Sequence, residues 1–321
     1  MAGDAELVRV IRGDHIESVH RGHAVICDAS GIRESWGDAD VAIFPRSSCK
    51  MVQALPLVEA GLERDPRRLA LACASHSGEA AHVDLARGWL SELGLGDEDL
   101  RCGAHWSTER EARDAMVRDG RTPCQCHNNC SGKHVGFLAL SRHLGGDPDY
   151  VDIDHPVQRT VLRTFEEVTD LDSPAHGIDG CSAPNPMTRL SALGRAMARF
   201  ATAGDDARGR AMTALRDAMA AHPHLVAGTG RACTDLMAAA TGGAVVKTGA
   251  EGVYVGILPE RGLGIALKIT DGTTRAAEAV IATLLVRSGA LEEGAPVARR
   301  LAHGPIRNWR GIVTGHMQTM V

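Results

Sequence analysis

Three short apolar runs, close together near the C-terminal end, constrain the fold of this chain most. They cover residues 244–247, 253–258 and 264–269, and turns containing glycine or proline separate them. Short β-rich runs joined by such turns predict an antiparallel meander. A helix predicted over residues 275–287 and ended by Gly289 follows the meander.

Other parts of the chain show both strand and helix patterns. Apolar segments at residues 7–11 and 23–27 predict paired strands. A helical period begins just behind Ser47, so this serine is expected at a helix entrance. Pro56 is expected to kink or end that helix, because proline cannot donate the backbone hydrogen bond that a helix interior needs.

Four more helices are predicted further along: one after Thr108, where Glu111 completes a capping box, one after Pro156, and two over residues 191–202 and 205–220. Strands towards both ends of the chain with helices between them predict an α+β fold, in which an antiparallel sheet is layered with helices and accompanied by a helical portion. We expect a single catalytic domain over residues 1–321, with two lobes as the open alternative, because no repeat or linker marks a boundary.

Charge and apolar content exclude several classes of function. Acidic residues outnumber basic ones by 40 to 35, a net charge of −5 without a basic block, so we expect no nucleic-acid partner. The longest apolar runs, such as residues 279–286, fall far short of the roughly 20 residues that cross a bilayer, so we expect no membrane span. The acidic residues 1–6 lack the basic head of a secretory signal, and we expect a cytoplasmic protein.

Cysteine and lysine usage bears on the chemistry. The nine cysteines are an odd number scattered through the chain, which favours free thiols or metal ligands over disulfides. Among the 35 basic residues only four are lysines: Lys50, Lys133, Lys247 and Lys268. Since arginine cannot lose its proton, each retained lysine is a candidate for a role that needs a neutral amine. The alternative is that codon bias favours arginine and that the four lysines have no special role.

The segment Arg46-Ser47-Ser48-Cys49-Lys50 contains a Ser-x-x-Lys motif. Residues three apart share one face of a helix, so a neutral Lys50 can take the proton of the Ser47 hydroxyl as that hydroxyl attacks a carbonyl. The helix N-terminus favours the negative charge that develops. The alternative is an N-cap serine beside a solvated lysine, with Cys49 as a packed hydrophobic residue or a rival nucleophile.

Three other segments carry chemically active side chains. Residues 73–79 (CASHSGE) leave a buried run into a glycine-containing turn, where they either line a site or cap a helix start. Residues 124–134 (CQCHNNCSGKH) hold three cysteines and two histidines, a density that suits zinc, and residues 178–186 (IDGCSAPNP) add a further cysteine beside an aspartate. Their spacing matches no standard zinc finger, and buried free cysteines are the alternative.

Two lysines end predicted strands. Ser-x-x-Lys followed far downstream by Lys247-Thr248-Gly249 is typical of the serine β-lactamase and penicillin-binding group, but the Ser-Asp-Asn motif of that group is absent. We therefore interpret Lys247 as a strand-end lysine without a catalytic role. Lys268 ends the last run of the meander.

The order of the motifs along the chain resembles that of the asparaginase II family, the rhizobial-type L-asparaginases. The similarity extends from about residue 20 to residue 289. It rests on Arg46-Ser47-x-x-Lys50, residues 73–79 (CASHSGE), 129–134 (NCSGKH), 154–156 (DHP) and 179–181 (DGC), and Lys268-Ile269-x-Asp271-Gly272. Several motifs in a fixed order are far more specific than any one of them.

The resemblance implies a fold similar to that of serine β-lactamases and glutaminases, and a homodimer that hydrolyses L-asparagine to L-aspartate and ammonia. It implies two Ser-Lys pairs in one pocket, Ser47 with Lys50 and Ser75 with Lys268, and it places Asp179 close to the second pair. In the expected mechanism Ser47 attacks the side-chain amide, Lys50 serves as general base and acid, and the other three residues assist hydrolysis of the acyl-enzyme.

The resemblance also implies a zinc ion, which is not required for the Ser-Lys chemistry, with ligands at Cys130, Lys133 and Cys181. A lysine ligand must be neutral to bind, a role that arginine cannot fill. From their position beside the motifs, Arg46 and His134 are candidates for binding the substrate carboxylate or orienting its amide.

Two alternatives stay open. Another serine amidohydrolase, such as a glutaminase, differs by one methylene in its substrate, which a pocket discriminates by only about 1–3 kcal/mol. A zinc- or thiol-based sensor that kept the fold and lost turnover is the second. Cys124, Cys126 and His127 crowd the expected metal loop and compete as zinc ligands.

Overall fold

The computed structural model describes residues 3–321, so Met1 and Ala2 of the acidic N-terminal stretch lie outside the described residues. The chain forms two compact units. The first holds the chain up to Ser48 together with residues 188–202 and 235–321, and the second holds residues 49–187 and 203–234. The α+β expectation is confirmed, since an antiparallel sheet with helices forms the first unit and helices form most of the second.

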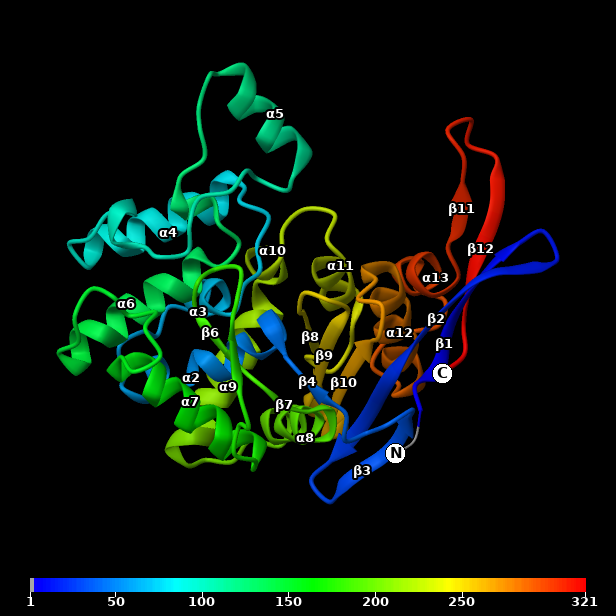
Figure 1. Ribbon diagram of the computed structural model, residues 1–321, viewed down its shortest axis with the longest axis horizontal. Coiled ribbons are helices and arrows are strands. Elements are labelled where there is room, and N and C mark those ends of the chain that lie inside the picture. Colours follow the sequence, from blue (N-terminus) through cyan, green and yellow to red (C-terminus); the bar gives the residue numbers. More distant parts are fainter. Residues whose placement is uncertain (1–2) are drawn as a thin grey trace. The chain divides into compact units, whose positions relative to one another are not determined.

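An eight-stranded antiparallel sheet is the centre of the first unit (Figure 1). Its order is β11-β12-β1-β2-β10-β9-β8, and β3 also pairs with β2. The strands are β1 (Ala5–Arg12), β2 (His15–Asp28), β3 (Gly31–Trp36), β8 (Val245–Thr248), β9 (Val253–Leu258), β10 (Leu263–Ile269), β11 (Pro305–Arg307) and β12 (Val313–Thr319). The paired N-terminal strands and the meander are confirmed, because β1 pairs with β2, and β9 pairs with both β8 and β10.

Helices cover both faces of this sheet. Successive side chains of a strand point to opposite faces, and all six residues of β9 are buried. The helix α8 (Leu190–Ala201) packs on β2, β9 and β10, and α12 (Thr274–Arg287) packs on β1, β9, β10 and β12. Gly264 makes the close approach of α8 possible, since a Cβ atom there would lie 2.2 Å from the backbone nitrogen of Ala198.

The chain continues beyond the last predicted helix. After α12 a further helix, α13 (Pro296–His303), leads into β11 and β12. These strands escaped prediction because only one of the seven residues of β12 is buried and the strand shows no clean alternation of apolar and polar residues. Its backbone hydrogen bonds to β1, in a register that places Thr319 opposite Val8, make it a strand.

The second unit is mainly helical. Its helices are α1 (Lys50–Gln53), α2 (Leu55–Glu59), α3 (Pro66–Ala72), α4 (Ala80–Glu92), α5 (Arg110–Arg118), α6 (Ser131–Leu144), α7 (Pro156–Thr169), α9 (Ala207–Ala221) and α10 (Pro223–Val226). Short 3₁₀ turns η2 (Asp97–Asp99) and η3 (Gln125–His127) lie between them, and β5 (His176–Ile178) pairs with β6 (Pro184–Pro186). The turn η1 (Arg46–Cys49) and the helix α11 (Ala232–Ala239) lie where the chain passes between units.

Remaining short elements complete the list. The strands β4 (Ala42–Ile43) and β7 (Thr188–Arg189) pair with each other, and the 3₁₀ turn η4 (Pro259–Arg261) joins β9 to β10.

Helix boundaries follow the sequence signals with three differences. The helix behind Ser47 is interrupted at Ala54, so that Pro56 lies in the first turn of α2, where its missing N–H costs nothing. The expected capping box at Thr108 is wrong: Glu109 caps α5 by accepting from two backbone amides. For residues 73–79, the alternative of a serine that caps the following helix is not met, because Glu79 takes the N-cap position of α4.

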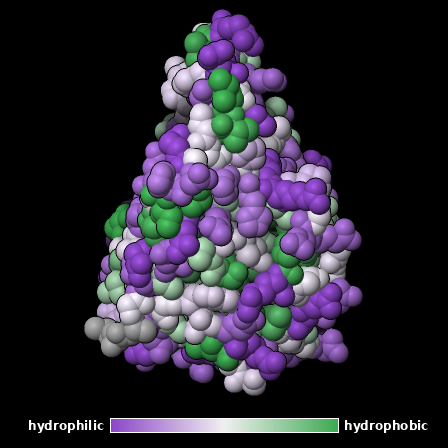
Figure 2. Space-filling view, turned by 90° about the vertical axis from the view of Figure 1, so that its right-hand side faces the viewer, coloured by the Kyte–Doolittle hydropathy of each residue, from purple (hydrophilic) through white to green (hydrophobic). Residues whose placement is uncertain are grey.

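None of the helices in residues 3–321 is long and apolar enough to cross a membrane. On the face shown in Figure 2, hydrophobic residues form small groups separated by hydrophilic ones.

Candidate active site

The side chain of Lys50 contacts residues of two other motifs. It opens α1 and is only 1% exposed. Its Nζ atom donates to the carbonyl oxygens of Ala74 and, at 3.4 Å, Asn129. The same atom lies 3.2 Å from Ser75 Oγ and 3.1 Å from Cys130 Sγ. A buried amine within hydrogen-bond reach of a serine hydroxyl is an arrangement that can move a proton.

Backbone hydrogen bonds hold Ser75 at this amine. The chain leaves α3 at Cys73 and does not continue the helix. The Ser75 amide donates to the carbonyl oxygen of Val226 at 2.9 Å, and the His76 amide donates to that of Asn129 at 3.2 Å. Because bonds on both sides fix the backbone, the hydroxyl of the buried Ser75 keeps its position relative to Lys50.

A strained turn precedes Ser47. Arg46 has a φ of 53°, in the left-handed region that a residue with a side chain rarely adopts. The Ser48 hydroxyl donates to the carbonyl oxygen of Pro45 at 2.7 Å, and Ser47 itself is half-buried. A Cβ atom on Gly249 would lie 2.6 Å from the Pro45 oxygen, so glycine is needed there. Strain of this kind, about 1–3 kcal/mol, persists at functional sites.

Lys268 lies on β10 and Lys247 lies on β8, and β9 separates these two strands in the sheet of the first unit. Lys268 pairs in register with His23 of β2 and Val253 of β9, and its Nζ donates to the carbonyl oxygen of Glu251. Partial burial lowers the pKa of Lys268, which favours the neutral amine. Lys247 is a buried lysine of β8 whose Nζ donates to the carbonyl oxygen of Thr248 at 2.7 Å.

Cys130, Lys133 and Cys181 come together in the second unit, and all three are buried. Lys133 Nζ donates to Cys181 Sγ at 3.0 Å. The Cys130 thiol and the Lys133 ammonium hold the pKa of Cys181 far below its ordinary value, although burial opposes them. Burial by itself lowers the pKa of Lys133, but the charges on Cys181 and Cys130 outweigh it and raise that pKa. Two sulfur atoms and an amine are therefore preassembled.

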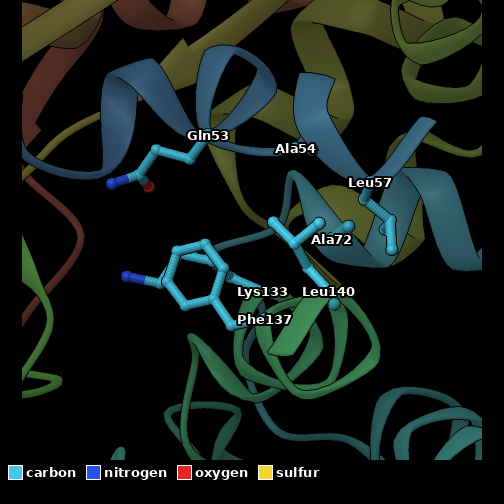
Figure 3. A pocket seen from close by; sticks show the side chains of 8 residues that line it. Gln53, Ala54, Leu57, Ala72, Lys133, Phe137 and Leu140 are labelled. Atoms are coloured by element: carbon cyan, nitrogen blue, oxygen red, sulfur yellow. The ribbon is translucent and has the colours of Figure 1, made fainter. Parts of the chain in front are cut away.

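The stem of Lys133 also lines a small cavity with room for about one water molecule. Figure 3 shows this stem beside the ring of Phe137, with Gln53 and Leu57 on other walls. The Nζ atom lies 5.4 Å from the centre of the Phe137 ring. The mostly apolar wall fixes the stem and leaves the amine to face the cysteines.

His134 and Asp179 flank this group differently. His134 is fully buried, its Nδ1 lies 2.8 Å from the Tyr150 hydroxyl, and burial lowers its pKa to about 4, so the ring is neutral. Asp179 is half-buried, and its charge raises the pKa of Lys133. Asp179 also accepts from the Gly180 amide at 2.7 Å.

One link between the motifs was missed in the sequence. The fully buried His76 accepts from the Gly78 amide at Nδ1, so its Nε2 carries the proton and donates to Ser131 Oγ at 2.9 Å. This bond joins residues 73–79 to the start of α6. The only signal in the sequence was that His76 and Ser131 each belong to one of the motifs.

A second group of possible ligands lies around η2 and η3. One carboxylate oxygen of Asp97 and the sulfur atoms of Cys124 and Cys126 all lie within 4.8 Å of one another, close enough to hold a metal ion. Cys124 and Cys126, which the sequence analysis named as competing zinc ligands, therefore form a separate group with Asp97. His127 lies beside it, with Nδ1 3.2 Å from Cys124 Sγ.

The structure thus brings together Lys50 with Ser75 and Cys130, and Lys133 with Cys130 and Cys181. Ser47, Arg46 and Lys268 belong to the first unit, and the charge of Arg46 contributes to the lowered pKa of Lys268.

Comparisons with known proteins identify the family. None of the curated proteins compared matches the chain. The structure of a beta-lactamase from Mycobacterium bovis is 13% identical and has a TM-score of 0.46, with 83% of this chain and 94% of that chain covered. The native structure of a protein named Mglu is 12% identical and also has a TM-score of 0.46, with 86% and 66% covered. The sequence profile of L-asparaginase II matches residues 8–319. The chain belongs to the L-asparaginase II family and is therefore an amidohydrolase.

Proposed function

We propose that this protein hydrolyses L-asparagine to L-aspartate and ammonia through an acyl-enzyme. The proposal rests on one observation above all: in a chain of the L-asparaginase II family, the buried amine of Lys50 lies 3.2 Å from the hydroxyl of Ser75. Burial among carbonyl groups and a thiol keeps this amine away from bulk water.

Ser47 is the nucleophile in the proposed first half-reaction. Its Oγ forms a bond to the amide carbon of the substrate side chain while its proton passes to Lys50. The carbon–nitrogen bond then breaks, and Lys50 returns the proton to the nitrogen that leaves as ammonia. Ser47 is three residues from Lys50, and the strained turn at Arg46 precedes it.

Water completes the reaction by attacking the Ser47 ester. Ser75, Lys268 and Asp179 are the residues we assign to this half. The lowered pKa of Lys268 supports a role in taking a proton from water, and the contact with Lys50 supports a role for Ser75 in passing protons. The carbon–oxygen bond to Ser47 breaks, aspartate leaves, and Ser47 regains its proton.

The substrate needs a cation for its α-carboxylate. We assign this role to Arg46, whose guanidinium stays charged and can bind a carboxylate through two hydrogen bonds. His134 is neutral, buried and hydrogen-bonded to Tyr150. We therefore give it a positioning role, in which it holds α6 and the adjacent Lys133 in place while leaving direct contact with the carboxylate to Arg46.

Cys130, Lys133 and Cys181 fit a zinc ion. Thiolate sulfur and neutral nitrogen are preferred zinc ligands, so the Lys133 ammonium and the Cys130 thiol would lose their protons when the ion binds. Bound zinc would supply a fixed positive charge that anchors the segment around Cys130. Since Lys50 Nζ contacts Cys130 Sγ at 3.1 Å, anchoring Cys130 also fixes one neighbour of the proposed base.

Two further parts of the proposal concern assembly and location. We propose a homodimer, to be checked by sedimentation of the purified protein. We also propose a cytoplasmic location, because an odd number of cysteines scattered along the chain is typical of a protein in a reducing compartment.

Ammonia release by the purified protein tests the function. With asparagine and glutamine as substrates, we expect kcat/KM for asparagine to be larger by about 10- to 200-fold, the discrimination that one methylene allows. Preference for glutamine would make the protein a glutaminase. Release from neither substrate, by protein that is folded and dimeric, would favour a sensor and contradict the proposal.

Metal analysis tests the zinc assignment separately. We expect Cys181→Ser to lower the zinc content by one equivalent per chain relative to the wild type, because it removes a thiolate ligand. Cys233→Ser changes a buried cysteine outside both groups and is expected to leave the content unchanged. Equal zinc in all three proteins would remove zinc from this site without affecting the Ser-Lys chemistry.

A further inference from the structure

The group formed by Asp97, Cys124 and Cys126 has no part in the proposed reaction. We propose that these three residues form a second metal site, which binds zinc or another divalent cation that prefers thiolates. Their ligand atoms lie within 4.8 Å of one another. Two sulfur atoms and one carboxylate oxygen form a donor set that suits zinc better than magnesium or calcium, which prefer oxygen alone.

Hydrogen bonds hold the loop that carries the donors in place. Asp97 accepts from the Gln125 amide at 3.0 Å and from the Cys126 amide at 2.8 Å, one bond to each carboxylate oxygen. The Gln125 side chain donates back to the carbonyl oxygens of Asp97 and Leu100. Each carboxylate oxygen has a second lone pair, so Asp97 can hold the loop and bind the ion together.

A divalent cation would compensate most of the charge that these donors carry once their thiols have lost their protons. Two thiolates and a carboxylate carry three negative charges, and a divalent cation leaves one of them uncompensated. Arg87 supplies the remaining positive charge, since its Nη2 donates to Cys124 Sγ at 3.3 Å. The thiol protons leave to solvent when the metal binds.

An ion can reach this group from a cavity. Arg87 and His127 both contact Cys124 Sγ, and both line a cavity of about 620 Å³ between α4 and α5. Cys124 itself is half-buried, whereas Cys126 is fully buried. Three protein ligands leave one position of a tetrahedral zinc ion for water or a small molecule from that cavity.

The second site would act on the beginning of α6. Ser131, the first residue of that helix, donates from its hydroxyl to the carbonyl oxygen of Cys126 at 3.1 Å. An ion that holds Cys126 therefore holds one end of the helix that carries Lys133. Its role is positioning, and it does not depend on which substrate the enzyme takes.

Metal stoichiometry distinguishes the two sites. Cys124→Ser/Cys126→Ser is expected to lose one equivalent of zinc per chain relative to the wild type, whatever the ammonia-release assay shows. The matched control is Cys102→Ser: Cys102 donates to the Gln125 carbonyl oxygen of the same loop but lies outside the donor set, and its replacement should leave the zinc content unchanged. Equal zinc content in the double variant and the wild type would overturn the proposal.

Alkylation of the wild-type protein gives a second answer that does not require a variant to fold. Iodoacetamide should modify Cys124 at least about tenfold more slowly with stoichiometric zinc than with a chelator, because a bound thiolate is a poorer nucleophile. Equal rates would contradict the site. A mass lower by two hydrogens, localised to the peptide with Cys124 and Cys126 in protein purified without reductant, would show a disulfide there and would also overturn the proposal.

Discussion

Ser47→Ala is expected to lower kcat for asparagine hydrolysis by about 10³-fold or more, because it removes the atom that forms the acyl-enzyme. The alanine keeps the short side chain of the turn, and Ser47 is only half-buried, so we expect the free energy of unfolding to change by less than about 1 kcal/mol. Ammonia release and urea unfolding of the same preparation measure both quantities.

Ser48→Ala is the matched control, since it alters the adjacent serine, whose hydroxyl is bound to the Pro45 oxygen. We expect it to retain activity within about tenfold. Intact-protein mass measurement of Ser75→Ala after rapid mixing with asparagine then identifies the nucleophile. An added aspartyl group on Ser47 supports the proposed order, whereas an active Ser47→Ala enzyme would assign the attack to another residue.

Lys50→Ala has the second large effect: loss of a general base and acid should lower kcat by about 10²- to 10⁴-fold. This substitution also leaves a cavity at a side chain that is 1% exposed, so we expect some loss of stability as well. Lower activity alone therefore does not separate a chemical role from a structural one.

Rescue by a small amine makes that separation. Ethylamine fits the space that the lysine side chain leaves and should restore part of kcat in Lys50→Ala. Only the neutral amine accepts a proton, so rescue at fixed total ethylamine should increase as the pH is raised towards the pKa of the amine. A stable variant with wild-type activity, or rescue that is independent of pH, would show that Lys50 is not the base.

The two groups of cysteines give α6 two anchors near its start. Cys130 and Lys133 belong to the proposed zinc site with Cys181, and Cys126 belongs to the second site. The bond from His76 to Ser131 adds a metal-independent connection to the segment that carries Ser75. Removing either metal should therefore disturb the positions of Ser75 and Lys50 less than removing both.

Local elements could be predicted where the chain itself carries the signal. The runs of the meander became β8, β9 and β10, and Pro156 opens α7, because alternation, turn residues and helix starts are encoded over a few neighbours. The strand β12 could not be predicted in this way, since it becomes a strand by pairing with β1, which lies at the other end of the sequence.

For the site, the order of motifs along the sequence determined the family and the types of side chain that carry the chemistry. Tertiary structure decided which of them touch. Lys50 lies against Ser75, 25 residues away, and Cys130, 80 residues away, and Lys133 meets Cys181 across 48 residues. Helix and strand periods specify only which neighbours share a face, whereas contacts over such separations depend on how whole elements pack to bury their apolar surface.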